Sequence, residues 1–462
     1  MIPERVLPLV DRTRDLAERF ALAGHRLYLV GGVVRDAILG ALDDGKDLDF
    51  TTDAPPDEIE RVLATWADAV WTQGKRFGTI GAKRGDVVVE VTTHRAEAYS
   101  PESRKPTVAF SDSVDADLGR RDFTVNAMAL RLPDLELIDP FGGIDDLAAR
   151  RLRTPLAPEE AFSDDPLRML RAARFAAAYD LKVDDAVVAA VERMHERLSI
   201  VSPERIRDEL DKLLVVEHPA PGLWFLVDTG LAGEFLPELP ALSVEQDPIH
   251  RHKDVLAHTI AVVENTSPER ILRLAALFHD VGKPRTRSVG AHGVSFHHHE
   301  VVGARMTRER MRALRYPNED VDAVSRLVEL HLRFHTYKMG WTDSAIRRYV
   351  RDAGPLLDRL NELTRCDCTT RNRRRAEELA ARLDHLEREI ERLRRQEELD
   401  AIRPDLDGRQ VMEHLGIGPG RVVGRALDHL LDLRMDRGPL GEEEAYRALD
   451  VWWAGQSEER QG

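Results

Sequence analysis

The stretch that decides the fold is residues 28–52, YLVGGVVRDAILGALDDGKDLDFTT. It begins as a short apolar strand and reaches two adjacent glycines, Gly31 and Gly32. An apolar helix is predicted over 33–39, because a glycine follows it and glycine commonly ends a helix. A polar turn then leads into a second predicted strand over 47–50. The segment therefore predicts a strand–glycine–helix–strand unit.

Two acids in the second strand suggest the chemistry of this unit. Side chains alternate between the faces of a strand, so Asp47 and Asp49 are expected on one face. Neighbouring carboxylates repel each other unless a cation lies between them, and hard divalent cations prefer oxygen ligands. Backbone N–H groups at Gly31 and Gly32 offer a cradle for phosphate. Each motif alone is typical of an ordinary surface turn, but the combination predicts a nucleotidyl-transfer site.

The order of these motifs resembles the class II tRNA nucleotidyltransferase and bacterial poly(A) polymerase family, through G-G-x-V-R-D-x-x-L-G followed by D-x-D-F-T-T. The resemblance implies an α+β fold class, with a polymerase-β-type nucleotidyltransferase head built on a small mixed sheet. An all-α neck, an HD domain and a helical tail are expected to follow. It also implies that Asp47 and Asp49 bind Mg²⁺ and activate a terminal 3′-hydroxyl, while Gly31, Gly32 and Arg35 hold a triphosphate.

The composition sets outer limits on the protein. At 462 residues the chain is long enough for several domains. No apolar run reaches the ~18 residues that a membrane span needs, and charged residues near the start argue against a signal peptide. A cytoplasmic location and no membrane partner are expected. The only two cysteines, Cys366 and Cys368, are too close for an ordinary disulfide and too few for a zinc site, which also fits a reducing compartment. The net charge of −15 means that any RNA contact must rely on local basic patches.

A β-hairpin is predicted after the first unit, with strands over 78–82 and 87–91. Glu90 projects from the second of these strands. It is either a third catalytic carboxylate near Asp47 and Asp49 or the cross-strand partner of a nearby arginine.

Residues 94–119 are polar and unpatterned, which predicts a long functional loop. In the family such a loop helps to switch between nucleotides. The motif R-R-D-F-T-x-N-A follows, and in the family it binds the phosphates and ribose of the incoming nucleotide. It places Arg120 and Arg121 where they can neutralise a triphosphate, with Asp122 and Asn126 expected on one helix face. The alternative is ordinary capping and surface charge at a helix start.

A predicted helix over 164–174 carries the selection of the base. Asp165 and Arg168 are three residues apart, so they are expected on the same helix face. They either form an intrahelical ion pair or both contact a nucleobase. A carboxylate and a guanidinium match the amine and bare ring nitrogen of cytosine and adenine. Uracil and guanine would leave these contacts mispaired, at ~1–3 kcal/mol each. The family motif E-D-x-x-R implies this template role, and here Asp164 replaces its leading Glu.

Two further arginines belong to the predicted nucleotide site. Arg171 lies one turn after Arg168. Arg205 lies in a motif R-x-x-x-E-L at the start of a helix with Ser202 as the expected N-cap. Arg205 either supports the template helix, as the family resemblance implies, or forms an ordinary i,i+4 pair with Glu209.

A second constellation consists of histidines and aspartates in the order H…H-D…H…H…D. Imidazole and carboxylate together suit divalent transition metals. The series resembles the HD phosphohydrolase domain, which hydrolyses phosphoesters with metal-bound water. The resemblance assigns one ion to His258, His279, Asp280 and Asp367, and a candidate second ion to His299 and His331. The alternative is a metal-free spacer domain.

Four domains are predicted from these motifs: a catalytic head (1–150), a neck with the template motif (151–245), an HD domain (246–370) and a helical tail (371–462). In the tail, the glycine-rich turn at 416–420 resembles a helix-hairpin-helix phosphate grip, or is an ordinary corner between helices. The tail is therefore a candidate for tRNA binding.

The expected function is template-independent addition of CCA to the 3′ end of tRNA from CTP and ATP, with a further hydrolase activity in the HD domain. The alternatives are a CC-adding or A-adding tRNA nucleotidyltransferase and a poly(A) polymerase. An alternative of another class is an HD phosphohydrolase or an RNA-binding scaffold whose head is inactive.

Overall fold

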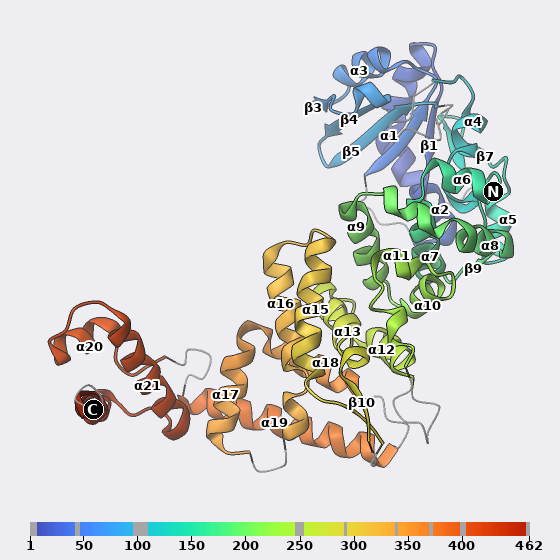
Figure 1. The fold of residues 1–462 in the computed structure, drawn as a ribbon. Helices are drawn as coiled ribbons and strands as arrows, with labels where there is room; N and C mark the ends of the chain where they lie inside the picture. Colours follow the sequence, from blue (N-terminus) through green and yellow to red (C-terminus); the bar gives the residue numbers. More distant parts are fainter. Residues whose placement is uncertain are drawn as a thin grey trace. The chain divides into compact units, whose positions relative to one another are not determined.

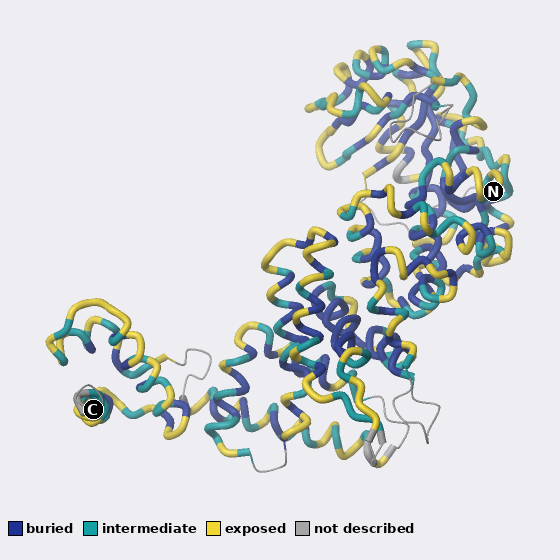
Figure 2. The backbone as a smooth tube through the Cα atoms, viewed as in Figure 1, coloured by how far each residue is buried: buried dark blue, intermediate teal, exposed yellow. Residues whose placement is uncertain are grey.

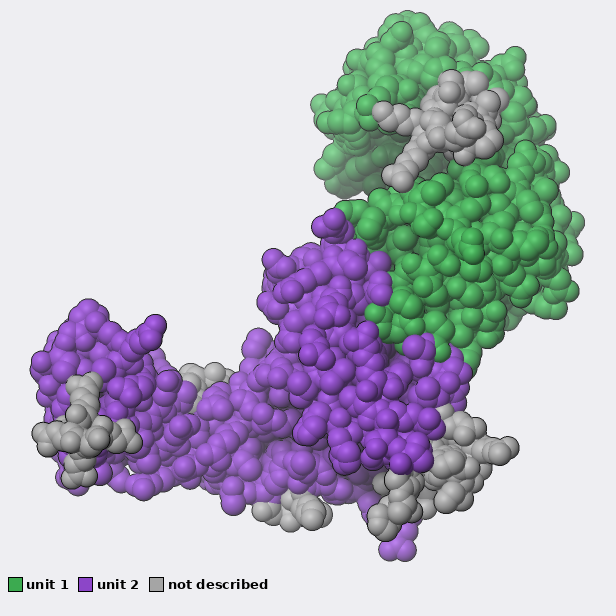
Figure 3. Space-filling view, in the orientation of Figure 1, with its two compact units in different colours: residues 1–240 green, residues 241–462 purple. Residues whose placement is uncertain are grey.

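The computed structural model describes residues 7–41, 47–95, 110–244, 254–290, 293–337, 341–368, 373–397 and 403–458. The chain divides into two compact units, residues 1–240 and residues 241–462, which have separate colours in Figure 3. The first unit contains the predicted head and most of the predicted neck. The predicted boundary between neck and HD domain lies outside the described residues.

A seven-stranded mixed sheet forms the centre of the first unit, in the order β3-β4-β5-β2-β1-β6-β7 (Figure 1). Strands β2 and β5 pair in parallel, and the other neighbours pair antiparallel. The predicted mixed sheet and head fold are thus confirmed. The strands are β1 (Leu27–Val30), β2 (Leu48–Thr52), β3 (Ala69–Trp71), β4 (Thr79–Arg84), β5 (Val87–Thr93), β6 (Ala129–Leu132) and β7 (Glu136–Ile138).

One face of this sheet is covered by helices, and the other carries the acids of β2 and β5 beside a second, smaller apolar cluster. Helices α1 (Leu7–Leu22), α2 (Gly32–Leu39) and α3 (Pro56–Ala64) contribute to a single apolar core with the sheet. In β2, Leu48 and Phe50 enter this core, whereas Asp49 between them is accessible. Figure 2 shows the central strands as largely buried. The alternation that was expected from the sequence therefore aims the acids away from the core.

The structure corrects the prediction for the segment after β5. Residues 96–109 of the predicted loop lie outside the described residues, and its end forms helix α4 (Val114–Gly119). The Ser113 hydroxyl caps α4 by accepting from Ala116 N–H, a signal that the unpatterned composition concealed. The predicted helix at Arg120–Asn126 is wrong, because only a 3₁₀ turn forms there, η3 (Thr124–Asn126).

The predicted template helix is also interrupted. Helix α6 (Pro158–Asp164) ends before Asp165, and α7 (Leu167–Tyr179) begins after Pro166. Asp165 has an extended backbone, with φ −142° and ψ 100°. Proline disfavours a helical conformation in the residue before it, which explains the break. Asp165 therefore lies at a bend and not within a helix.

The rest of the first unit is mainly helical. The predicted all-α neck also contains a short parallel pairing between β8 (Arg151–Leu152) and β9 (Lys182–Val183). The remaining α-helices of this unit are α5 (Gly143–Ala148), α8 (Asp185–Met194), α9 (Pro203–Leu214), α10 (Ala220–Asp228) and α11 (Leu231–Phe235).

Among its described residues, the second unit is helical apart from one hairpin, β10 (Arg287–Gly290) with β11 (Gly293–Phe296). Its last three helices share a small apolar core of their own. None of the described helices is long and apolar enough to cross a membrane. The helices are α12 (Val255–Asn265), α13 (Arg270–Phe278), α14 (Lys283–Thr286), α15 (His299–Ala313), α16 (Asn318–Leu330), α17 (Asp343–Ala353), α18 (Leu357–Asp367), α19 (Arg373–Glu397), α20 (Gly408–Leu415), α21 (Arg421–Arg437) and α22 (Glu442–Glu458).

Candidate active site

The parallel pairing of β2 with β5 brings two predicted acids side by side. Asp49 lies directly opposite Glu90 in the β2–β5 register. Asp47 is the residue immediately before β2. Burial raises the pKa of Asp49, the charges of Glu90 and Asp47 raise it further, and the Arg121 guanidinium opposes them. The three carboxylates therefore form an anionic group that a divalent cation would relieve.

The glycine turn approaches these acids closely. Gly31 has φ +75°, which favours glycine, and it directly precedes α2. A Cβ at Gly31 would lie 3.1 Å from Arg121 Nη1 and 4.0 Å from Asp49 Oδ2. The backbone at this turn thus comes close to both Arg121 and the predicted catalytic acid Asp49.

A cavity of about 370 Å³ joins the acids to the predicted nucleotide-binding residues. The predicted residues that line it come from β2, β5, the segment after α4, the bend before α7, α7 itself and α9. They are Asp49, Glu90, Arg120, Arg121, Asp122, Asp165, Arg168, Arg171 and Arg205. Residues that are far apart in the sequence therefore meet around one space.

Within this cavity an arginine and an aspartate form a tight pair. Asp122 accepts hydrogen bonds from Arg171 Nε at 2.7 Å and from Asn126 Nδ2 at 2.9 Å. Burial opposes the charged form of Asp122, but Arg171 and Asn126 hold its pKa below the usual range. Asp122 is therefore a fixed anion that orients Arg171 at the cavity wall.

The two residues of the expected template are held separately. Asp165 accepts a hydrogen bond of 2.8 Å from Arg205 Nη2. Arg168 donates to the backbone carbonyl oxygens of Ala161, at 3.3 Å, and of Arg120. The alternative of an intrahelical pair between Asp165 and Arg168 is thus not what forms.

The expected i,i+4 pair of Arg205 with Glu209 does not form either. Glu209 is buried and accepts from Arg174 Nε at 2.6 Å, while Arg205 extends to Asp165. Helix α9 therefore contacts the bend before α7 through Arg205.

The structure does not bring every predicted residue into the cavity. Arg35 is only 4% exposed, donates to Asp36, Asn126 and the Tyr179 hydroxyl, and lies 4.1 Å from the centre of the Tyr179 ring. Asn126 is buried between Arg35 and Asp122. Both side chains brace the wall behind the cavity and do not line it.

Several cavity residues were absent from the sequence-based prediction. Thr79 and Thr92 lie opposite each other on β4 and β5, and Arg95 donates to the Thr79 hydroxyl at 2.9 Å. Asp117, on α4, lies beside Arg120 and Arg121 at 3.9 Å and 3.4 Å. The sequence signal for Thr92 was its position two residues after Glu90 of a predicted strand, because every second side chain of a strand lies on the same face.

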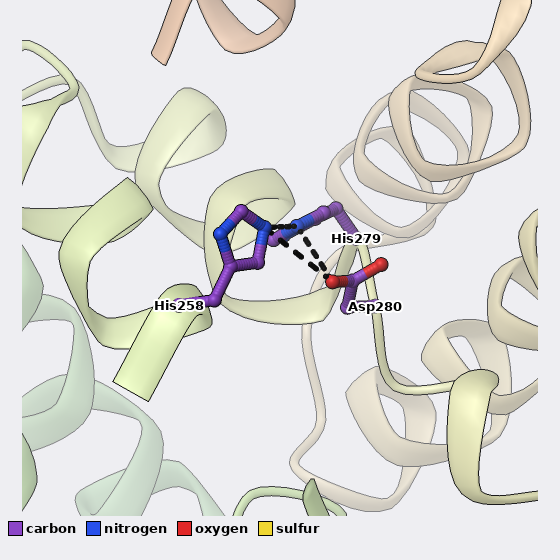
Figure 4. Close-up of side chains that lie close together, drawn as sticks. All are labelled: His258, His279 and Asp280. Atoms are coloured by element: carbon purple, nitrogen blue, oxygen red, sulfur yellow. Dashed lines mark hydrogen bonds and ion pairs between the residues drawn. The ribbon is translucent and has the colours of Figure 1, made fainter. Parts of the chain in front are cut away.

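The second unit brings together the predicted HD residues, from the ends of several helices. Figure 4 shows His258, His279 and Asp280 converging. The His279 Nε2 atom lies 3.2 Å from Asp280 Oδ2 and 3.3 Å from His258 Nε2. Asp367, at the end of α18, completes this group with Oδ1 at 2.9 Å from His258 Nε2. The group has the nitrogen and oxygen donors that a divalent transition metal requires.

A neighbouring group consists of Asp280, His299 and His331, whose donor atoms also lie close enough to share an ion. His299 Nε2 is 3.4 Å from Asp280 Oδ1. His299 and His331 each use Nδ1 to contact a backbone carbonyl, at 2.8 Å and 2.6 Å. Among the described residues, neither buried Nε2 atom has a hydrogen-bond partner, so both are oriented as ligands would be.

The titration of these histidines differs sharply. Burial opposes the charged form of His279, yet the carboxylates of Asp280 and Asp367 raise its pKa to about 10. Burial and the neighbouring positive His279 lower the pKa of His331 to about 3. His279 therefore carries a proton that a metal would displace, whereas His331 offers a neutral imidazole.

Comparisons with known proteins identify relatives of both units. Family models match residues 27–153 (Poly A polymerase head domain), 180–242 (Probable RNA and SrmB- binding site of polymerase A) and 255–393 (HD domain). The chain is 32% identical over 441 residues to an A-adding tRNA nucleotidyltransferase of Deinococcus radiodurans, covering 92% of this chain and 95% of that protein.

The sequence match to one CCA-adding enzyme covers part of that protein's length, whereas the likeness in fold to another extends over its whole chain. The CCA-adding enzyme of Limosilactobacillus reuteri is 38% identical over 227 residues, which are 49% of this chain and 55% of that protein. The chain thus spans about half the length of this relative. The crystal structure of the Bacillus stearothermophilus CCA-adding enzyme in complex with CTP has a TM-score of 0.69 at 23% identity, covering 98% and 100% of the chains. This likeness shows a shared fold.

Proposed function

The chain belongs to the tRNA nucleotidyltransferase family, and we propose that it adds C, C and A to the 3′ end of tRNA from CTP and ATP. The observation that carries the proposal is the single cavity that joins Asp49 and Glu90 to Asp165 and Arg168. Acids for nucleotidyl transfer and a pair of groups for base selection thus face one space.

Asp47, Asp49 and Glu90 are the proposed ligands of a divalent metal, which we infer to be Mg²⁺. Their donor atoms are all hard carboxylate oxygens, and the raised pKa of Asp49 reflects a cluster of like charges that fits such an ion. When bound, Mg²⁺ would stabilise charge on the attacking and leaving oxygens of an in-line displacement. Asp49 then serves to hold the 3′-hydroxyl of the tRNA in line with the α-phosphate.

The remaining groups bind and select the nucleotide. The backbone at Gly31 and Gly32, with Arg121 beside it, is the proposed triphosphate cradle. Asp165 would accept from the exocyclic amine of C or A, and Arg168 would donate to the ring nitrogen. Arg205 donates to Asp165 and orients this carboxylate as an acceptor, which does not match the carbonyl of U or G.

A second candidate is addition of the terminal A alone. It is favoured by one observation: the relative that matches across 92% of this chain carries the name of an A-adding enzyme. Both candidates use the same acids and the same template, so the site residues do not separate them.

The decisive experiment offers tRNA that ends before the first C, and tRNA that ends in CC, with each labelled nucleotide alone and in pairs. A CCA-adding enzyme extends the first substrate by CCA only when CTP and ATP are both present. An A-adding enzyme extends only the second substrate, by one A. Long A tails would indicate a poly(A) polymerase, and no incorporation at all would overturn the proposal.

The second unit supports a further proposed activity, hydrolysis of phosphoesters. His258, His279, Asp280 and Asp367 would hold one divalent ion, and Asp280, His299 and His331 a second. The ions would supply a water nucleophile at neutral pH. Lys283 Nζ lies 2.6 Å from Asp280 Oδ2 and adds a positive charge beside the group. Release of phosphate from a generic phosphomonoester, lost in Asp280→Ala, tests this activity separately from nucleotide addition.

The tail is a proposed tRNA contact. Its support is the glycine-rich turn between α20 and α21, which is followed by the exposed Arg421 and Arg425. Replacing both arginines with glutamate should weaken tRNA binding without changing the affinity for CTP. We also infer a cytoplasmic location, in which the free thiols of Cys366 and Cys368 stay reduced.

A further inference from the structure

Thr79, Thr92 and Arg95 line the cavity but take no part in the chemistry above. We propose that these residues, with the adjacent Phe110 ring, bind the last nucleotide of the RNA that accepts the new residue. The inference rests on the proposed nucleotide addition and assigns the position of its second substrate. Three independent features of the first unit support it: the side of the acids on which the residues lie, their polar chemistry and an exposed ring.

The first feature is the order of the strands. The glycine turn follows β1, which pairs with β2 on one side of Asp49. Strand β5, with Glu90 and Thr92, pairs with β2 on the other side, and β4, with Thr79, lies beyond it. In an in-line displacement the attacking and leaving oxygens lie on opposite sides of the phosphorus. A triphosphate at the glycine turn therefore requires the attacking 3′-hydroxyl to arrive from the β5–β4 side.

The distances along the sheet fit one nucleotide. Thr92 is two residues beyond Glu90 on β5 and shares its face, which places it ~7 Å further along the strand. Thr79 is the direct partner of Thr92 on β4. A ribose at these threonines would keep its 3′-oxygen within reach of the acids.

The second feature is a chain of hydrogen bonds. Arg95 Nη2 donates to Thr79 Oγ1 at 2.9 Å, and Thr79 Oγ1 lies 2.9 Å from Thr92 Oγ1. The bond between the two threonines uses only one of their two hydroxyl hydrogens. The other hydroxyl hydrogen is not used by this bond, whichever threonine is the donor. Hydroxyl and guanidinium groups are the side chains that contact ribose and phosphate in RNA complexes. The row therefore suits the backbone of a nucleotide.

The third feature is Phe110, a residue that is 48% exposed and that lies beside the cavity residue Arg95 without lining the cavity itself. Phe110 forms an isolated β-bridge with Arg95, and a Cβ at Gly78 would lie only 2.7 Å from its Cε1 atom. The ring thus lies on the backbone next to Thr79. Exposed aromatic rings stack on unpaired bases regardless of the identity of the base. This tolerance suits an acceptor RNA whose last base differs from one addition to the next.

The test measures both substrates in the full-length protein. Thr79→Val and Thr92→Val keep the shape of the side chains and remove the hydroxyls, and Phe110→Ala removes the ring. For addition of A to tRNA ending in CC, each hydroxyl variant should lower kcat/KM for tRNA about three- to tenfold. Phe110→Ala should lower it about five- to a hundredfold, and Phe110→Trp should restore it. The Kd for ATP alone should stay within twofold of wild type, by roughly the error of such measurements.

Two controls separate the outcomes. Arg84→Ala removes a basic residue of β4 that pairs with Asp15 outside the cavity, and it should leave kcat/KM for tRNA unchanged. A tRNA whose terminal ribose lacks its 2′-hydroxyl should be a poorer substrate for wild type but not for a Thr79→Val/Thr92→Val variant. Unchanged kcat/KM for tRNA, or a weaker Kd for ATP in the same variants, would overturn the inference. Failure of wild type to extend any tRNA would instead overturn the proposed function.

Discussion

The Arg205 guanidinium, on α9, donates to the Asp165 carboxylate at the bend before α7, with 2.8 Å between Nη2 and Oδ2. The pair joins residues that are 40 positions apart in the sequence. Asp165 is thereby oriented at the cavity wall, while Arg168 is held by backbone carbonyls. The proposed recognition of C and A therefore depends on a contact between two separate helical segments.

Loss of this support should relax base selection. Asp165→Ala should let UTP or GTP be incorporated, and Arg205→Ala should do the same more weakly, because Asp165 stays in place but loses its orientation. The ratio of kcat/KM for CTP over UTP should fall about ten- to a hundredfold, since each mispaired group no longer costs ~1–3 kcal/mol. Arg193→Ala, which breaks an exposed pair with Glu159, is the matched control. Unchanged strictness in both variants would mean that the base is read elsewhere.

Removal of an acid should stop chemistry and spare binding. Asp49→Ala and Asp47→Ala should each lower kcat for nucleotide incorporation at least about a thousandfold, because the metal that we propose they hold would contribute several kcal/mol of transition-state stabilisation. tRNA binding, measured by filter retention, should stay near the wild-type value. Glu90→Gln, beside Asp49 in the register, should also be impaired. Normal turnover in Asp47→Ala would exclude the metal role of that residue.

Metal affinity in the head should be unusually sensitive to acid. The folded-state pKa of Asp49 is raised by burial and by Glu90 and Asp47, so Asp49 takes up a proton at a higher pH than an ordinary aspartate. Mg²⁺ needs the carboxylate form, so its affinity should fall as the pH drops, beginning above the usual titration range of aspartate. Titration calorimetry from pH 4 to 8 measures the effect.

Removing a negative charge beside Asp49 should shift the pH dependence of Mg²⁺ affinity in a known direction. Glu90→Gln removes a like charge, so the Asp49 pKa falls and the loss of affinity should shift to lower pH. Asp86→Asn, at the exposed turn between β4 and β5, should leave the pH at which Mg²⁺ affinity is lost unchanged. If the loss of Mg²⁺ affinity shifted to higher pH in Glu90→Gln, the effect of the Glu90 charge on Asp49 would be contradicted.

The HD group should hold two ions that can be removed one at a time. After dialysis against Co²⁺ and then buffer, wild type should retain two ions per chain, by analogy with two-metal sites. His299→Ala/His331→Ala should retain one, because the group of His258, His279, Asp280 and Asp367 remains. His258→Ala should lose mainly the other ion. Elemental analysis gives the stoichiometry, and a wild-type value of zero would favour the spacer interpretation.

Arg35 should stabilise the head without binding the triphosphate directly. Its guanidinium donates to Asp36, which is 2% exposed, so Arg35→Ala breaks a buried ion pair and should lower the unfolding free energy by about 3–5 kcal/mol. Thermal unfolding and the Kd for CTP of the folded fraction are the measurements. The double variant Arg35→Met/Asp36→Asn should recover part of the loss. A weaker Kd with normal stability would return Arg35 to the phosphate cradle.

Much of the architecture followed from local pattern. Alternation along residues 47–50 placed Leu48 and Phe50 in the core and Asp49 outside it, because a strand has a strict period of two. The end of α2 at Gly40 followed from the left-handed conformation that glycine accepts, here φ +73°. The order of histidines and aspartates likewise identified the HD residues before their distances were known.

The sequence by itself therefore determined the type of head, the acids and the candidate ligands, since these depend on residue type and short spacing. Only the tertiary structure decided which charges are partners. It paired Arg205 with Asp165 instead of Glu209, and it buried Arg35 against Tyr179 behind the cavity. The reason is physical: a guanidinium forms its bonds with whatever acceptor the packed helices bring within about 3 Å, and sequence spacing does not contain that proximity.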